Sequence, residues 1–160
     1  MTYPIESEFI RLNFEFYSEV VEEKDRAFAY IESFKWCGNV KNSSLYLNLG
    51  SVICIFLFEI DNLSSIDDNF LWIVVGDLPS MYLDIYGSKT TVEVLERYSS
   101  LARDWISNVE SNLSVEDCYP FEVGPTKEMA QMLKKRIKQI EESIIPNIDE
   151  IELPPFLKEL

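Results

Sequence analysis

Histidine is absent from this sequence of 160 residues. Its absence excludes Ser–His and Cys–His nucleophile pairs and removes the commonest metal ligand of proteins. Basic residues are also scarce, since 28 Asp and Glu residues outnumber 14 Lys and Arg residues and the formal net charge is −14. Such a charge argues against nucleic acid and anionic membranes as partners. It favours a basic protein partner, although an acidic surface also serves plain solubility.

Cysteines and long hydrophobic runs are few as well. The 3 cysteines are widely spaced and form no CxxC motif, so neither a disulfide framework nor a zinc site is predicted. No apolar stretch reaches the length of about 18 residues that suggests a membrane span. The first residues also lack the basic and then apolar order of a secretion signal. We therefore expect a cytoplasmic protein.

Apolar residues are nevertheless abundant, at 47% of the chain, which is ample for a core in one domain spanning residues 1–160. Continuous apolar runs at 52–60 and 70–75 predict buried strands, and shorter runs at 45–49 and 82–85 predict weaker ones. The turn-rich loop 61–69 is too short for a helical crossover, so the two strong strands should form an antiparallel hairpin.

Apolar residues at three- and four-residue steps predict helices on both sides of this sheet region in the chain. We expect an N-terminal helical region at 5–40, clearest at 18–36, and a helical pair at 90–146 that opens with a capping box at Thr90 and Glu93. Residues 147–160 form an acidic tail that should dock loosely or lie extended. The predicted fold is α+β, with a small antiparallel sheet of about three or four strands at 45–86 packed against an N-terminal helix and two long C-terminal helices.

Acids at or near strand ends are the remaining candidates for catalysis, because paired carboxylates can act as acid and base. Such acids more often form turns or solvated charges. A metal loop built on Asp61, Asp67 and Asp68 lacks the glycine and the closing glutamate of a calcium-binding loop. We therefore predict no catalytic residue, no metal site and no cofactor. The tryptophans at 36, 72 and 105 are assigned to core packing.

The charge pattern of the sheet region is less ordinary. No basic residue lies between Lys41 and Lys89, whereas six acids do, which predicts an acidic rim without local compensation. Basic residues gather instead at 134–138, near the end of the last helix. We predict that the acidic rim binds a basic protein, with a merely solvated rim as the alternative. The predicted partner-binding residues are Glu59, Asp61, Asp67, Asp68, Asp77 and Asp84.

The segment 76–79, Gly-Asp-Leu-Pro, ends the second strong strand. It lacks the glycine cluster and the lysine of a phosphate-binding loop, so a structural turn is the better interpretation. Gly76 would permit an unusual backbone angle, Asp77 would hydrogen-bond nearby amides, and Pro79 would keep the following residues out of the strand.

A set of motifs over residues 18–146 resembles a family of small, uncharacterised bacterial cytosolic domains in which a strand ends in Gly-Asp-Leu-Pro and a tyrosine follows. The residues that carry the resemblance are Arg26 to Ile31, Phe58-Glu59-Ile60, Leu71 to Pro79, Tyr82-Leu83, Trp105, Cys118-Tyr119-Pro120-Phe121 and Pro125-Thr126. The resemblance implies an α+β fold and no catalytic residues. In its size, acidity and lack of catalytic apparatus the chain is also similar to immunity proteins of contact-dependent and polymorphic toxin systems.

We therefore expect a binding module that is not an enzyme, namely a cytoplasmic immunity protein that occludes a basic toxin nuclease domain. Its carboxylates would satisfy the Lys and Arg residues with which the toxin binds phosphate. Two other classes stay open. One is a carboxylate-using enzyme, which loss of a hydrolase activity in Asp77→Asn would favour, and the other is a housekeeping scaffold.

Overall fold

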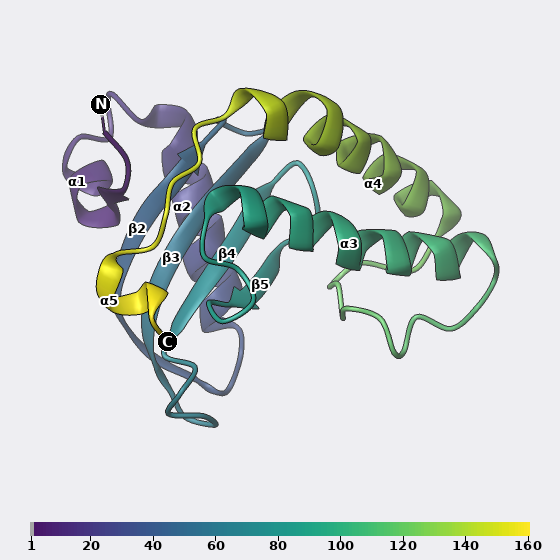
Figure 1. The fold of residues 1–160 in the computed structure, drawn as a ribbon, viewed down its shortest axis with the longest axis horizontal. Helices are drawn as coiled ribbons and strands as arrows, with labels where there is room; N and C mark the ends of the chain where they lie inside the picture. The colour runs from purple at the N-terminus through teal and green to yellow at the C-terminus, as the bar shows by residue number, and fades with distance from the viewer. Residues whose placement is uncertain (1) are drawn as a thin grey trace.

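The structure is organised around one antiparallel sheet. The computed structural model describes residues 2–160, and its five strands lie side by side in chain order, each antiparallel to the next (Figure 1). This confirms the predicted α+β class, but the sheet has five strands instead of three or four. The strands are β1 (Ile5–Glu6), β2 (Cys37–Asn48), β3 (Ile53–Asn62), β4 (Phe70–Gly76) and β5 (Met81–Asp84).

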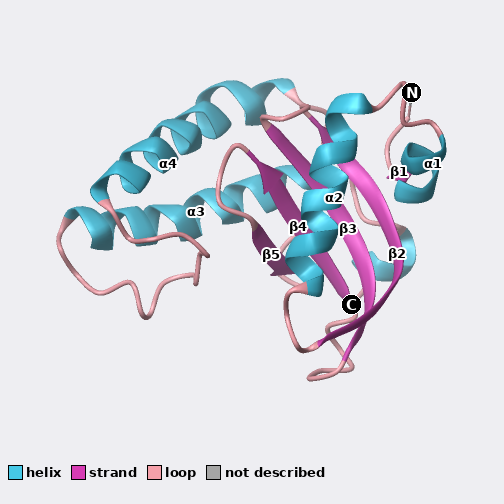
Figure 2. Ribbon diagram, turned by 180° about the vertical axis from the view of Figure 1, so that it is seen from behind, coloured by secondary structure: helices cyan, strands magenta, loops and turns pink. Residues whose placement is uncertain are grey.

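Helices cover both faces of this sheet. Helix α2 (Ser18–Glu32) crosses one face (Figure 2), and α3 (Thr91–Glu110) with α4 (Lys127–Gln139) packs on the other (Figure 1). Among residues 2–160, none of the helices has both the length and the apolar character that a membrane crossing requires. The shorter elements are α1 (Ser7–Leu12), a π-helical turn η1 (Ile140–Ile144), a 3₁₀ turn η2 (Ile145–Asn147) and α5 (Pro155–Lys158).

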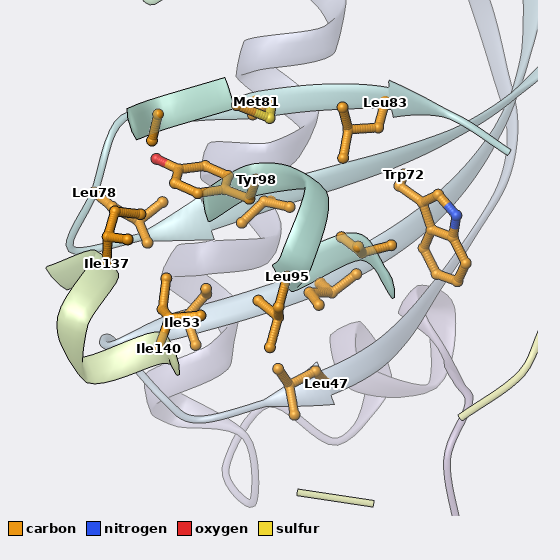
Figure 3. Close-up of a cluster of buried hydrophobic side chains, with 14 of the residues drawn as sticks. Leu47, Ile53, Trp72, Leu78, Met81, Leu83, Leu95, Tyr98, Ile137 and Ile140 are labelled. Atoms are coloured by element: carbon orange, nitrogen blue, oxygen red, sulfur yellow. The ribbon is translucent and has the colours of Figure 1, made fainter. Parts of the chain in front are cut away.

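This two-sided cover explains why β3 and β4 are apolar without interruption. Successive side chains of a strand point to opposite faces. In β3, Ile53 and Ile55 enter the core under α3 and α4, whereas Cys54 and Phe56 enter the core under α2. Figure 3 shows the first of these cores, where Tyr98 of α3 lies among side chains from the sheet. A strand that is buried on both faces has no reason to alternate with polar residues.

Strand β2 begins much earlier than the sequence indicates. The predicted helical region ran to residue 40 and the predicted strand began at 45, and both boundaries were wrong. The polar half of β2 pairs with β3, with Asn42 opposite Glu59 and Ser43 opposite Phe58. Within residues 2–160, β2 pairs on its outer side with only the two residues of β1. Polar residues suit such an edge because its outward backbone groups stay hydrated. Because this half of β2 is polar, the apolar pattern did not predict it as a strand.

The turn between β4 and β5 requires glycine at position 76. Gly76 has a φ of 142°, and a Cβ atom there would lie 2.3 Å from the carbonyl oxygen of Val52. The prediction of an unusual backbone angle is therefore confirmed. The amide of Asp77 donates to that same carbonyl over 3.0 Å, which holds the start of the turn against the beginning of β3.

Three helices also contact this turn through its carbonyl groups. The prediction that the side chain of Asp77 bonds nearby amides was wrong, because its carboxylate pairs with Arg136. The turn thus fixes the positions of helices on both faces of the sheet. The donors and accepting carbonyl oxygens are Arg26 of α2 with Gly76 (2.9 Å), Arg136 of α4 with Asp77 (3.0 Å) and Tyr98 of α3 with Pro79 (2.6 Å).

The C-terminal tail is docked, so the expectation of loose docking was wrong. It passes in front of the sheet beside α3 (Figure 1). Glu152 forms a β-bridge with Thr90, and Leu153 and Leu157 are buried. Thr90 also caps α3, since its hydroxyl accepts a hydrogen bond of 3.1 Å from the amide of Glu93, as the capping-box pattern predicts. The carboxylate of Glu93 accepts from the amide of Lys89 over 2.7 Å, one residue before the position that the pattern predicts.

Candidate protein-binding site

The six predicted partner-binding acids lie at two ends of the sheet. Strand pairing places Glu59 and Asp84 at the end where β3 runs into β4. Asp77 lies at the opposite end, beyond Gly76, which pairs with the first residue of β3. The structure therefore separates Asp77 from the other five, and the acids that share one end are Glu59, Asp61, Asp67, Asp68 and Asp84.

Three of the six acids have basic partners from other elements, so the expectation of an uncompensated rim was wrong for them. The partners lie on β2, α3 and α4. The fold brings these elements next to the segment between Lys41 and Lys89, which has no basic residue of its own. Among the described residues, Glu59, Asp67 and Asp68 have no ion-pair partner. The pairs are Asp61 with Lys41 (3.0 Å), Asp84 with Arg97 (3.1 Å) and Asp77 with Arg136.

The connection from β3 to β4 is held in shape by two asparagine side chains. The side-chain oxygen of Asn62 accepts from the amides of Ser64 and Ser65, each over 3.0 Å, and its amide group donates to the carbonyl oxygen of Asp68 over 3.0 Å. Asn69 donates to the carbonyl oxygen at position 66 over 2.7 Å. These bonds replace a regular ladder, so the segment 62–69, which we name the Asn loop, has a defined conformation.

The Asn loop presents apolar side chains to solvent. Leu63 is 70% exposed and Ile66 is 82% exposed, next to the unpaired carboxylates of Asp67 and Asp68. The hydroxyl of Tyr86 donates to the carbonyl oxygen of Asp67 over 2.6 Å and ties the loop to the segment after β5. Apolar side chains held outward on an ordered loop are typical of a surface that binds another protein.

A cleft lies between the Asn loop, the outer edge of β5 and the segment 111–126. Its volume is about 460 Å³, which is within the usual range for binding clefts. Half-buried aromatic residues and buried or half-buried leucines form much of its wall, and Asp68, Asp84 and Arg97 are its charged residues. The aromatic residues are Trp36, Tyr82 and Tyr119, and the aliphatic residues are Leu71, Leu83 and Leu101.

At the cleft, one hydroxyl group occupies the outer edge of β5. The Tyr119 hydroxyl accepts a bond of 2.9 Å from the amide of Tyr82 and lies 3.2 Å from its carbonyl oxygen, as a donor to it. These are the two backbone groups that a further strand would engage. Tyr119 therefore covers the edge in the manner of a neighbouring strand, and the Tyr30 hydroxyl lies 3.2 Å from it.

We expect Tyr119→Phe to lower the free energy of unfolding by about 1–3 kcal/mol, because the amide and carbonyl of Tyr82 lose their partner. Chemical denaturation measures the change. Tyr30→Phe is the matched control, since its hydroxyl bonds only that of Tyr119 among the bonds described. A loss in Tyr119→Phe no larger than in Tyr30→Phe would contradict this role of the hydroxyl.

The pair of Asp84 and Arg97 fixes one wall of the cleft. Burial tends to raise the pKa of Asp84, but hydrogen bonds from Arg97 and from the amides of Gly87 and Tyr86 outweigh it and hold this pKa below its usual value. The Nη1 atom of Arg97 is buried, and a Cβ atom at Gly87 would lie 2.6 Å from it. The absence of a side chain at Gly87 thus lets the guanidinium lie flat against the backbone.

The tyrosine hydroxyls around the site are held in their neutral form. Burial raises the pKa of Tyr119 to about 12, and it also raises the pKa values of Tyr30 and Tyr82, so these hydroxyls stay neutral. Burial also raises the pKa values of the thiols of Cys37 and Cys118, which neighbour Trp36 and Tyr119 in the sequence, and this disfavours the reactive thiolate. Within residues 2–160 there is no group of three or more acids or cysteines that could hold a metal ion.

Sequence reasoning missed the aromatic half of this site. Trp72 and Trp105 are buried as predicted. Trp36 packs against the core under α2, but it is only half-buried and also lines the cleft, which the assignment to core packing did not include. Tyr82 and Tyr119 are 37 positions apart and meet only through the fold. Trp36 ends the periodic stretch 18–36, so no local signal separated it from a residue of the core.

No family model matches the chain, and no curated protein or solved structure matches it either. The resemblance to the Gly-Asp-Leu-Pro domain family therefore stays a prediction. The function must be argued from the site alone.

Proposed function

We propose that this chain is a non-catalytic binding module, specifically a cytoplasmic immunity protein that neutralises a basic toxin nuclease domain by occluding its active site. The observation that carries the proposal is the Asn loop. Its own amide side chains hold it in shape while Leu63 and Ile66 point to solvent beside the unpaired carboxylates of Asp67 and Asp68.

The two kinds of side chain on the Asn loop would act at different stages of binding. The carboxylates of Asp67 and Asp68, with Glu59 nearby, attract a basic surface over a distance and speed the encounter. Leu63 and Ile66 then bury apolar area against the partner and slow dissociation. A nuclease binds phosphate with Lys and Arg residues, so a carboxylate-bearing loop placed over them would exclude the nucleic acid.

The double charge reversal Asp67→Lys with Asp68→Lys is expected to slow association about tenfold or more at low salt. The partner to use is a basic toxin nuclease domain, if the gene next to that of this chain encodes one, and stopped-flow mixing at several ionic strengths gives the rate. The protection that this chain gives to cells expressing the toxin domain should decrease as the association rate decreases. The matched control is Asp149→Lys with Glu150→Lys, which changes the net charge equally at two exposed tail residues that form no ion pair with another described residue.

Equal rates for the wild type and the Asn-loop variant would exclude this surface as the binding site. Equal slowing by both double variants would mean that net charge alone, and not the Asn loop, governs the encounter. A neighbouring gene for a metabolic enzyme instead of a toxin would argue against the immunity role itself.

A further inference from the structure

We infer that the cleft beside the Asn loop receives one arginine side chain of the basic partner. This inference rests on the proposed function and names the chemical group that enters the site. It is based on three properties of the lining residues, namely their net charge, their aromatic rings and their aliphatic side chains.

The lining residues carry one unmatched negative charge. Arg97 neutralises Asp84 through a bond of 3.1 Å between Nη2 and Oδ2. The buried Nη1 atom of Arg97 lies against Gly87, so the packed guanidinium stays with Asp84. Asp68 is then the one carboxylate of the lining, among the described residues, without an ion-pair partner. A single cation would restore neutrality.

Aromatic rings line the cleft on the side of Trp36. One face of the Trp36 indole stacks on Phe34, with ring centroids 5.0 Å apart and planes at 23°. Tyr82 meets Trp36 edge to face at a centroid distance of 5.2 Å, and Tyr119 packs on Tyr82 at 6.1 Å. Rings fixed in this way line the cleft at defined positions, so a cation can contact them at little cost in conformational entropy.

The mixture of rings, one free carboxylate and aliphatic wall suits arginine better than lysine. A guanidinium is planar, stacks on aromatic rings and is less strongly hydrated than an ammonium, so it enters a half-apolar cleft more readily. Its methylene stem would lie along Leu83 and Leu101. The volume of about 460 Å³ accommodates such a side chain together with part of its backbone.

The probe for this inference is N-acetyl-arginine amide, and its uncharged counterpart N-acetyl-citrulline amide has nearly the same shape. Titration into the ¹⁵N-labelled full chain is followed at the indole N–H of Trp36, with the buried Trp72 and Trp105 as internal references. We expect saturable shifts at Trp36 with a dissociation constant of about 1–10 mM. The citrulline probe should give no saturable shift.

The adjacent acids Asp67 and Asp68 provide a matched pair of variants. Both lie on the Asn loop and both lack an ion-pair partner among the described residues, but only Asp68 lines the cleft. Asp68→Asn should weaken binding of the arginine probe about threefold or more, whereas Asp67→Asn should leave it within about twofold. Equal weakening by both variants, or saturable binding of citrulline, would overturn the inference.

The outcome is separable from that of the proposed function. If the arginine probe fails to shift Trp36 while the double reversal at 67 and 68 still slows association with the basic domain, the cleft assignment is wrong and the binding surface stands. If the probe binds as expected but the double reversal has no effect on association, the proposed function is wrong. Saturable binding of an indole or phenol probe in place of arginine would replace the cation with an aromatic anchor.

Discussion

Gly76→Ala is expected to lower the free energy of unfolding by about 4 kcal/mol or more, the largest effect of any single substitution considered for this chain. The φ of 142° at Gly76 is a conformation that residues with a side chain rarely adopt. The added Cβ atom would also lie 2.3 Å from the carbonyl oxygen of Val52, and backbone cannot move aside as a flexible side chain can. Relief would have to shift a turn to which Arg26, Arg136 and Tyr98 all donate.

Urea denaturation followed by tryptophan fluorescence measures this loss, because Trp72 and Trp105 lie in the core. Gly124→Ala is the matched control. Gly124 does not have a positive φ, and a Cβ atom added there would lie 3.8 Å from its nearest neighbour, so we expect a change within about 0.5 kcal/mol. Similar stabilities for the two variants would show that the turn does not organise the fold.

Glu23→Gln is expected to stabilise the protein at pH 7 by about 1–2 kcal/mol. The side chain of Glu23 is only 2% exposed, and its one ion-pair partner among the described residues, Arg26, lies 3.7 Å away. The Oε2 atom of Glu23 has no hydrogen-bond partner within the described structure. A neutral amide costs less to bury than a carboxylate, and its oxygen can still accept from Arg26.

The gain should depend on pH in a defined direction. Burial raises the pKa of Glu23, Arg26 opposes this in part, and the nearby acids Glu22 and Asp77 raise it further. The folded chain then holds this proton more tightly than the unfolded chain, so the wild type loses stability as the pH rises from about 4.5 through the raised pKa. The difference between Glu23→Gln and the wild type should therefore vanish near pH 4 and grow toward neutrality.

Denaturation of both chains from pH 4 to pH 8 tests this, with Glu22→Gln as the control. Glu22 is the exposed neighbour on the same helix. Its substitution removes the same charge and lessens the repulsion of Glu23, but it leaves the carboxylate of Glu23 buried, so its effect should be smaller. A stabilisation that is as large in Glu22→Gln would point to the net charge of the chain, and one that does not change with pH would point to packing.

The parts of the fold that local patterns encode could be predicted from the sequence. Buried strands on both faces produce continuous apolar runs, so β3 and β4 were evident, as was the turn at Gly76. The cap at Thr90 depends on residues three positions apart, so it could also be predicted from the sequence. The first half of strand β2 was not predicted because it lies at a polar edge of the sheet. At such an edge the backbone is hydrated, so the residues need not be apolar.

The candidate site was predictable only in its charges. Grouping five acids at one end follows from a hairpin and its loop, which the sequence indicated. Which of them are free does not follow, because Lys41, Arg97 and Arg136 reach their partners from other elements. The aromatic wall is also a tertiary product, since Trp36, Tyr82 and Tyr119 come from three separate segments. Local periodicity carries no information about such meetings.

Another surface of the chain could compete with the Asn loop for a partner. Apolar side chains are exposed along the short helix α1 and the turn after it, at Phe9, Leu12, Phe14 and Phe16. Of the acids near this surface, Glu8 is paired with Arg11, whereas the exposed Glu15 has no ion-pair partner among the described residues. The two surfaces lie on different elements, so a mapping experiment separates them.

Amide hydrogen exchange of the full chain, with and without the proposed basic partner domain, is the most direct measurement of where the partner binds. Binding through the Asn loop predicts slowed exchange at residues 62–69 and in the segment 82–87 that adjoins the cleft, with little change in α1. Slowed exchange confined to residues 9–16 or to the basic helix α4, with the Asn loop unchanged, would contradict the proposed binding surface.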